Sequence, residues 1–172
     1  MNKVNKIVYL GLLICLEVIF TRFLSIQTPI IRVGFGFLPI AAAGILLGPL
    51  WAGIAAAIAD ILGMMIFPKG AYFPGFTVSA FVSGLIYGIA FYKKPISLFR
   101  STIAVVVIIV IIDLFMNTYW LTIITGKAAK VILYPRLIKT IIMLPIQTVL
   151  IFSLWKVIEK LDFLRNFKRA QN

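Results

Sequence analysis

Apolar residues follow one another along nearly the whole chain, and short segments rich in charge, glycine and proline separate the apolar runs. A helix needs about 20 predominantly apolar residues to cross a membrane. By this measure the pattern predicts spanning helices over residues 6–24, 73–91, 102–124 and 137–158. A further run, 37–67, is too long for one span, and Gly48-Pro49 interrupts it. Because proline lacks the N–H that a helix needs, two shorter helices, 37–47 and 51–66, are expected there.

The composition places these six helices in a membrane. Of the 172 residues, 62% are hydrophobic, and the mean hydropathy is +1.10. A soluble domain of this length exposes far more polar surface. The N-terminal run contains Glu17, and no small-x-small cleavage site follows it, so a retained helix is expected rather than a signal peptide. The expected fold is all-α: an integral membrane protein with six transmembrane helices, in which residues 1–172 form a single membrane-embedded domain.

The chain is strongly basic, with 17 Lys and Arg residues against five Asp and Glu residues and a formal charge of +12. In a soluble protein this balance would favour nucleic-acid binding, but cytoplasmic loops of membrane proteins are enriched in Lys and Arg. No nucleic-acid partner is therefore expected. With six spans, the side of the two termini carries the larger share of basic residues, so both termini are expected in the cytoplasm. The connections on the opposite side contain cations but no Asp or Glu, which suggests a second role for positive charge there.

The residue types present exclude several chemistries. The chain has no histidine, and Cys15 is its single cysteine, so a disulfide within the chain and a His/Cys metal site are excluded. The phosphate-binding motif of P-loop ATPases does not occur, and no Ser or Cys nucleophile has a histidine to activate it. We therefore expect neither an enzymatic activity nor a cofactor.

Acidic residues inside predicted membrane helices are costly and usually have a partner or a function. Asp60 is expected to pack against a polar neighbour. Asp113 and Asn117 are four residues apart, so they project from one face of their helix. Two interpretations remain open: an internal hydrogen-bonded network, or a ligand-facing helix end that includes Trp120.

Cations and aromatic rings recur together in the three connections on the side away from the termini. The simpler interpretation is an aromatic belt at the membrane interface. The alternative is a binding site whose rings stack on a flat ligand and whose cations hold a negative group. The prolines and glycines of FPKGAYFPGFT (67–77) favour an ordered loop, and the recurrence favours a site. The candidate ligand-binding residues are Arg32, Phe35, Phe37, Lys69, Tyr72, Phe73, Phe76, Thr77, Asn117, Trp120, Tyr134 and Arg136, with Lys139 one turn further on.

Small residues at four-residue spacing mark one face of the first predicted helix. Gly11 and Cys15 lie on that face. Such faces let membrane helices approach closely. Packing within the same chain is the first interpretation, and an interface with a partner helix is the second.

Four stretches, taken together, resemble the substrate-binding S components of energy-coupling factor (ECF) vitamin transporters, and most closely the folate-specific members. They cover most of the chain in order: RVGFGFLP at 32–39, Gly48-Pro49 with Ala59-Asp60, FPKGAYFPGFT at 67–77, and the region 117–139. The resemblance implies a multi-pass protein of the bacterial cell membrane with a vitamin pocket open to the outside. It also implies a complex with a transmembrane coupling subunit and two cytoplasmic ATPases. Gly11 and Cys15 are the nearest match to the family's docking face for the coupling subunit.

The resemblance makes the expected function high-affinity folate binding for ATP-dependent uptake. Arg32 or Arg136 is expected to pair with a folate carboxylate or a polar ring edge, because arginine offers a bidentate contact. Stacking is expected from Phe35, Tyr72, Phe76 and Trp120, and hydrogen bonds to the pterin from Asn117 and Thr77. The alternatives are an S component for riboflavin, thiamine or biotin, a small membrane assembly protein without transport activity, and a self-powered secondary transporter.

Overall fold

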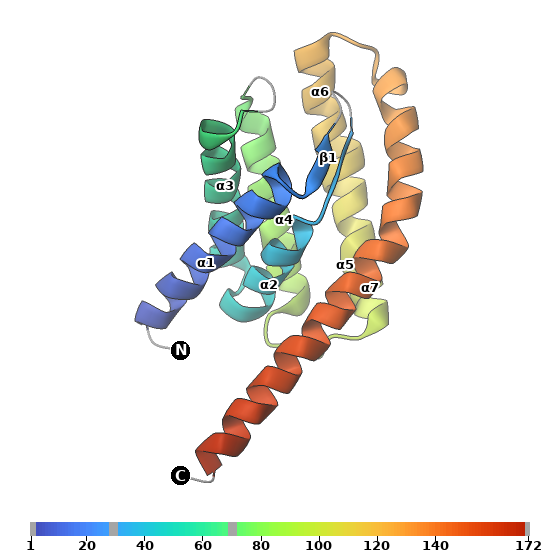
Figure 1. Ribbon diagram of the computed structural model, residues 1–172. Coiled ribbons are helices and arrows are strands. Elements are labelled where there is room, and N and C mark those ends of the chain that lie inside the picture. The colour runs from blue at the N-terminus through green and yellow to red at the C-terminus, as the bar shows by residue number, and fades with distance from the viewer. Residues whose placement is uncertain (1–2, 28–30, 69–71, 171–172) are drawn as a thin grey trace.

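A computed structural model describes the backbone of residues 3–27, 31–68 and 72–170 and shows an all-α bundle. Both termini lie towards the same end of the bundle, and the last helix extends beyond the others there (Figure 1). Within the described residues, five helical segments are long and apolar enough to cross a membrane, and α2 is a shorter apolar helix. The helices are α1 (Lys3–Arg22), α2 (Phe37–Leu47), α3 (Pro49–Ile66), α4 (Pro74–Phe91), α5 (Leu98–Ile108), η1 (Ile109–Met116), α6 (Asn117–Thr125) and α7 (Ala129–Ala170).

The break between α2 and α3 lies where the sequence predicts it. Gly48 has a φ of 91°, a conformation that side-chain-bearing residues rarely adopt. Pro49 then begins α3, where its missing N–H costs nothing because the first turn of a helix has free N–H groups. The long apolar run is therefore two helices, as expected.

Helices α3 and α4 pack backbone against backbone. A Cβ added at Gly84 would lie 2.4 Å from the carbonyl oxygen of Ala52, and one added at Gly88 would lie 2.1 Å from the Cα of Pro49. Small residues thus allow the close approach that stabilises helix pairs in lipid. These contacts fix the C-terminal half of α4 against the start of α3, and the N-terminal end of α4 carries part of the site described below.

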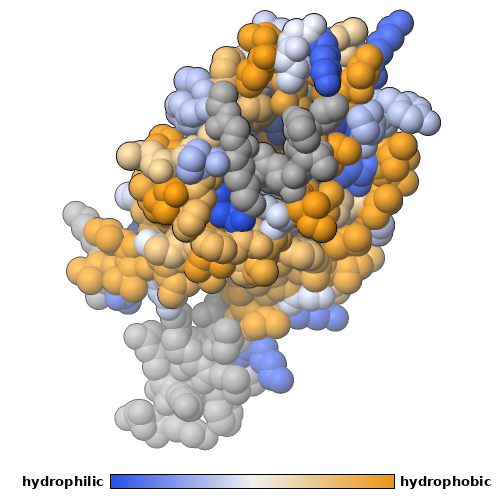
Figure 2. All heavy atoms as spheres, turned by 45° about the horizontal axis from the view of Figure 1, so that its top comes forward, coloured by the Kyte–Doolittle hydropathy of each residue, from blue (hydrophilic) through white to orange (hydrophobic). Residues whose placement is uncertain are grey.

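The buried apolar residues form two clusters that share α2. One joins α1, α2 and α3, and the other joins α2 to α4, α5, η1 and α7 around Tyr87, Phe91 and Ile151. Large apolar side chains are also exposed along the outer helix faces. Figure 2 shows hydrophobic residues over much of the visible flank, with hydrophilic residues gathered at the end of the molecule that faces the viewer. This distribution suits a protein surrounded by lipid.

Two segments differ from the sequence-based expectation. The connection from α1 to α2 is a small antiparallel hairpin, β1 (Ser25–Gln27) and β2 (Arg32–Gly34), in which Ile26 pairs with Val33. The last helix begins at Ala129 and includes Pro135, so Tyr134 and Arg136 are helical rather than part of a loop. Proline is tolerated inside membrane helices when neighbouring groups satisfy the freed carbonyl. The prediction that this helix begins at residue 137 is therefore wrong.

Candidate functional site

A cavity of about 930 Å³ lies among the helices. This volume is in the range of pockets that enclose a vitamin-sized molecule. The residues around it come from α1, the hairpin, α2, α3, α4, α5, η1, α6 and α7 and from the segments just before α2 and α4. The cavity is thus the place where segments far apart in the sequence meet.

One wall of the cavity carries a cluster of three charged residues. Asp113, on η1, lies 3.4 Å from Arg136 and 3.2 Å from Lys139, both on α7. All three line the cavity. Asp113 is one negative charge beside two positive charges, and the acidic residues Glu17 and Asp60 line the cavity elsewhere, in surroundings where isolated charge is expensive. Arg136 and Lys139 are the lining cations that an anionic group in the cavity would meet.

Three buried polar side chains also face the cavity. Tyr87 Oη, Asn117 Oδ1 and Gln147 Oε1 have no hydrogen-bond partner within the described part of the chain. Native proteins rarely leave buried polar atoms unpaired, because each one loses its contacts with water. These atoms are therefore placed to accept or share hydrogen bonds with a bound molecule.

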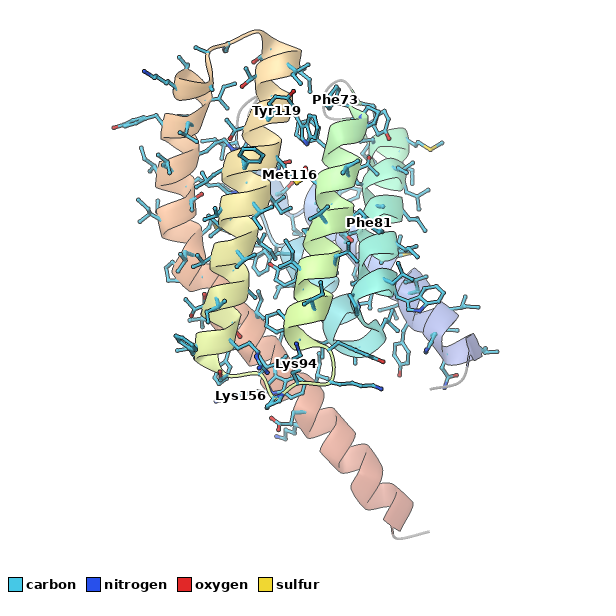
Figure 3. The ribbon with its side chains drawn as sticks, turned by 180° about the vertical axis from the view of Figure 1, so that it is seen from behind. Phe73, Phe81, Lys94, Met116, Tyr119 and Lys156 are labelled. Carbon is cyan, nitrogen blue, oxygen red and sulfur yellow. The ribbon has the colours of Figure 1, made fainter. Side chains whose placement is uncertain are left out.

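Aromatic rings form the wall at the N-terminal end of α4. Tyr72, Phe73 and Phe76 line the cavity. The ring of Phe73 lies 6.2 Å from that of Phe76 and 5.5 Å from that of Trp120. Figure 3 shows Phe73 at the same end of the bundle as Tyr119 on α6. The rings provide flat apolar surface beside the polar groups.

A chain of polar contacts holds this aromatic wall to α3 and α1. Thr77 Oγ1 donates to Asp60 Oδ2 at 2.8 Å and lies 3.2 Å from Tyr72 Oη. Asp60 in turn lies 3.9 Å from Arg22 at the end of α1. The expectation that Asp60 packs against a polar neighbour is confirmed.

The structure brings six of the twelve predicted ligand-binding residues to the cavity. These six are Phe37, Tyr72, Phe73, Phe76, Asn117 and Arg136. Phe35 and Tyr134 are exposed, at 43% and 71%, and do not line the cavity. Thr77 and Trp120 lie behind its wall: Thr77 is bonded to Asp60, and Trp120 Nε1 donates to Ser79 Oγ at 3.1 Å. Lys69 and the Arg32 side chain lie outside the described part of the chain.

Sequence reasoning missed several residues that line the cavity. Tyr87 and Ser83 lie inside apolar stretches of α4 and carry no local signal. Gln147 does have a signal in the sequence, because an uncharged amide in the middle of a predicted membrane helix needs a partner or a function. The Asp113–Asn117 pair was found by its spacing, and both residues line the cavity.

Gly11 and Cys15 lie on the outer surface of α1. Both are exposed, and a Cβ added at Gly11 would meet nothing within 4 Å. Packing within the same chain is therefore wrong for these two positions. The face is open to lipid or to a partner helix.

A membrane-type helical bundle around a cavity lined by aromatic rings, buried polar atoms and the cations Arg136 and Lys139 defines a membrane protein with an internal site for a small molecule. The chain belongs to the family described as ECF-type riboflavin transporter, S component, whose sequence model matches residues 1–160. It is thus the S component of a transporter, not an enzyme, and a multi-pass protein of the cell membrane.

Individual relatives are similar over most of their length. The chain is 56% identical over 164 residues to the folate transporter FolT of Clostridium novyi (strain NT), covering 95% of each chain. It is 34% identical over 149 residues to the folate transporter FolT of Leuconostoc mesenteroides, covering 83% of this chain and 80% of the relative. A crystal structure of FolT bound with folic acid is similar in fold, with a TM-score of 0.83 and 40% identity over 86% of this chain and 90% of that chain.

Proposed function

We propose that this chain is the folate-binding S component of an ECF transporter and mediates ATP-dependent uptake of folate. The observation that carries the proposal is the cavity, which joins aromatic walls, buried polar atoms without a hydrogen-bond partner among the described residues, and the cations Arg136 and Lys139. The 56% identity to a folate transporter supports the same ligand.

Folate matches these features group by group. Its pterin ring carries amino and N–H donors, which suit the unpaired amide oxygens of Asn117 and Gln147. Its flat rings suit the walls formed by Phe73 and Phe76. Its glutamate tail carries two carboxylates, and Arg136 can donate two parallel hydrogen bonds to one of them. Binding then involves fit and charge balance, with no covalent chemistry.

Riboflavin is the second candidate, because the matching family model is described by that vitamin. Its ring system would also suit the aromatic walls. Riboflavin has no carboxylate, however, so it offers no anionic group to Arg136 and Lys139. The charge cluster therefore favours folate.

The partners of this chain are proposed from its family. A transmembrane coupling subunit and two cytoplasmic ATPases supply the energy, and the open face of Gly11 and Cys15 on α1 docks the coupling subunit. Both termini lie in the cytoplasm. Basic residues near the end of the bundle that carries the termini, such as Lys94 and Lys156, support this orientation.

The ligand that the protein retains from cells tests the proposal. The purified chain is expected to release a compound with the absorbance spectrum and mass of a folate. A flavin spectrum would contradict the proposal and favour riboflavin. Protein stripped of ligand and incubated with each vitamin controls for loss of the compound during purification.

A further inference from the structure

A second hollow lies on the flank of the bundle, between the C-terminal half of α4 and the N-terminal half of α5. Its volume is about 690 Å³, and it shares no lining residue with the first cavity. Most of its surface is apolar, from Ile86, Ile89, Ala90, Ile103, Ala104 and Val107. We call this hollow the α4–α5 groove.

The mouth of the α4–α5 groove is basic. Lys94 and Arg100 line it, and no acidic residue does. Lys94 Nζ donates to the carbonyl of Ile89 at 2.8 Å, and an Arg100 Nη donates to the carbonyl of Pro95 at 2.8 Å. Within the described residues neither side chain has a carboxylate partner. A lysine has three donor hydrogens and an arginine five, so each retains donors for an anion.

The backbone around the mouth also favours negative charge. Ser97 is the N-cap of α5, and its Oγ accepts from the N–H of Arg100 at 3.2 Å. The first turn of α5 therefore points its positive dipole end into the same region as the two cations. Lys94, Arg100 and the first turn of α5 therefore all favour an anionic group at the mouth of the groove.

The groove opens towards the surroundings of the bundle rather than into its core. Ile89 and Phe99, on its rim, are 62% and 75% exposed. Figure 3 shows Lys94 at the end of the bundle opposite Phe73, where α4 passes into α5. In a membrane, the apolar length of the groove therefore faces acyl chains, and its basic mouth lies towards the headgroups.

We propose that the α4–α5 groove binds an anionic phospholipid. The phosphate and its anionic headgroup contact Lys94 and Arg100, and an acyl chain fills the apolar groove. Among the described residues no acid pairs with the two cations, so a zwitterionic lipid, whose headgroup brings its own positive charge, fits less well. This site is separate from the folate cavity and does not depend on the proposed function.

Native mass spectrometry of the purified protein with phosphatidylglycerol and with phosphatidylcholine tests this proposal. Each basic side chain near a membrane surface contributes on the order of a few-fold to anionic-lipid binding. We therefore expect the double variant Lys94→Gln/Arg100→Gln to bind phosphatidylglycerol about 30-fold more weakly. The matched control is Lys127→Gln/Lys130→Gln, which removes the same charge near the α6–α7 connection and should change binding less than about threefold.

A conservative variant separates charge from local structure. Lys94→Arg/Arg100→Lys keeps both cations and is expected to retain the preference for phosphatidylglycerol. Equal binding of the two lipids by the unmodified protein, or an equal loss in the control variant, would overturn the proposal. So would a Lys94→Gln/Arg100→Gln variant that retains lipid but no longer co-purifies with the coupling subunit, because the groove would then be a protein interface. Folate affinity measured on the same samples shows whether the folate site is intact.

Discussion

Arg136 is the residue that we expect to recognise a carboxylate in the cavity. It lines the cavity, is 7% exposed, and is held 3.4 Å from Asp113. If it pairs with a folate carboxylate in this partly dry site, Arg136→Ala should cost on the order of 2–5 kcal/mol of binding free energy. That is about 30-fold or more in affinity, measurable by calorimetric titration with folate.

Tyr134 offers a matched control two positions away. Its side chain is 71% exposed and does not line the cavity, so Tyr134→Ala should leave the folate affinity within about threefold. A loss under threefold for Arg136→Ala would contradict the charge-pairing account. An equal loss for both variants would indicate a general disturbance of α7 instead.

Gln147 allows a test in which binding and stability change in different directions. Its buried Oε1 has no hydrogen-bond partner among the described residues, so it destabilises the empty protein. Gln147→Leu should therefore leave the thermal stability of the empty protein unchanged or higher, while weakening folate binding about three- to tenfold. Lower stability with unchanged affinity would show that Gln147 has a structural role only.

Arg136 lines the cavity and Tyr134 does not, which shows how precisely the sequence alone can predict single site residues. Both were predicted from their place in a supposed loop. In a helix, residues two positions apart point about 200° away from each other, so only one of the pair can face the cavity. Three rings of FPKGAYFPGFT, those of Tyr72, Phe73 and Phe76, line the cavity, and their role in ligand binding stays a prediction. Tyr87 could not be found, since only the tertiary fold shows that its hydroxyl meets a cavity.

At the scale of elements, the hydroxyl of Thr77 links Tyr72, just before α4, to α3. Thr77 connects Tyr72, on the cavity wall, to Asp60 on α3. Thr77→Val keeps the shape but removes both contacts, so the wall should loosen and folate should dissociate about five- to 30-fold faster. Stopped-flow measurement of folate release tests this expectation.

Thr122→Val is the matched control for this variant. The hydroxyl of Thr122 bonds only the carbonyl of Thr118 in its own helix, so its loss should not change the dissociation rate. If both variants release folate at the unmodified rate, the contact chain from Tyr72 to Asp60 does not hold the ligand in place.

The apolar pattern predicted helices correctly where the local sequence determines their ends. It failed where contacts with other helices determine them. The Gly48-Pro49 break was predictable, because both residues act through the local backbone. Pro135 does not break its helix, because inside a membrane bundle neighbouring groups can satisfy the carbonyl that a proline leaves without a partner. The π-helical segment η1, which places Asp113 on the cavity wall, also has no signature in the order of apolar residues.

At the scale of the whole molecule, the outer face of α1 tests the proposed assembly. A Cβ at Gly11 meets nothing within 4 Å, so a larger side chain there does not disturb the chain itself. Gly11→Leu should therefore leave folate affinity unchanged but reduce co-purification with the coupling subunit and the two ATPases. Leu12→Ala, which shortens a neighbouring exposed side chain, should retain the complex. Full assembly by Gly11→Leu would show that this face does not dock the partner.

The fold class and the membrane location could be predicted because they follow from composition and the length of apolar runs. The ligand depends on how charges and unpaired polar atoms meet in three dimensions, which apolar patterning does not encode. The prediction of folate as the ligand came from the resemblance to a known family. The cations Arg136 and Lys139, beside Asp113 in the cavity, give that prediction a physical basis.

Equilibrium binding of folate, with riboflavin as competitor, tests the central claim most directly. The purified chain, stripped of retained ligand, is titrated with folate alone and then in the presence of excess riboflavin. We expect folate to bind at one site with sub-micromolar affinity, and we expect that riboflavin does not displace it. The reason is that folate, unlike riboflavin, supplies a carboxylate to Arg136 and Lys139. Weak folate binding, or its displacement by riboflavin, would contradict the account.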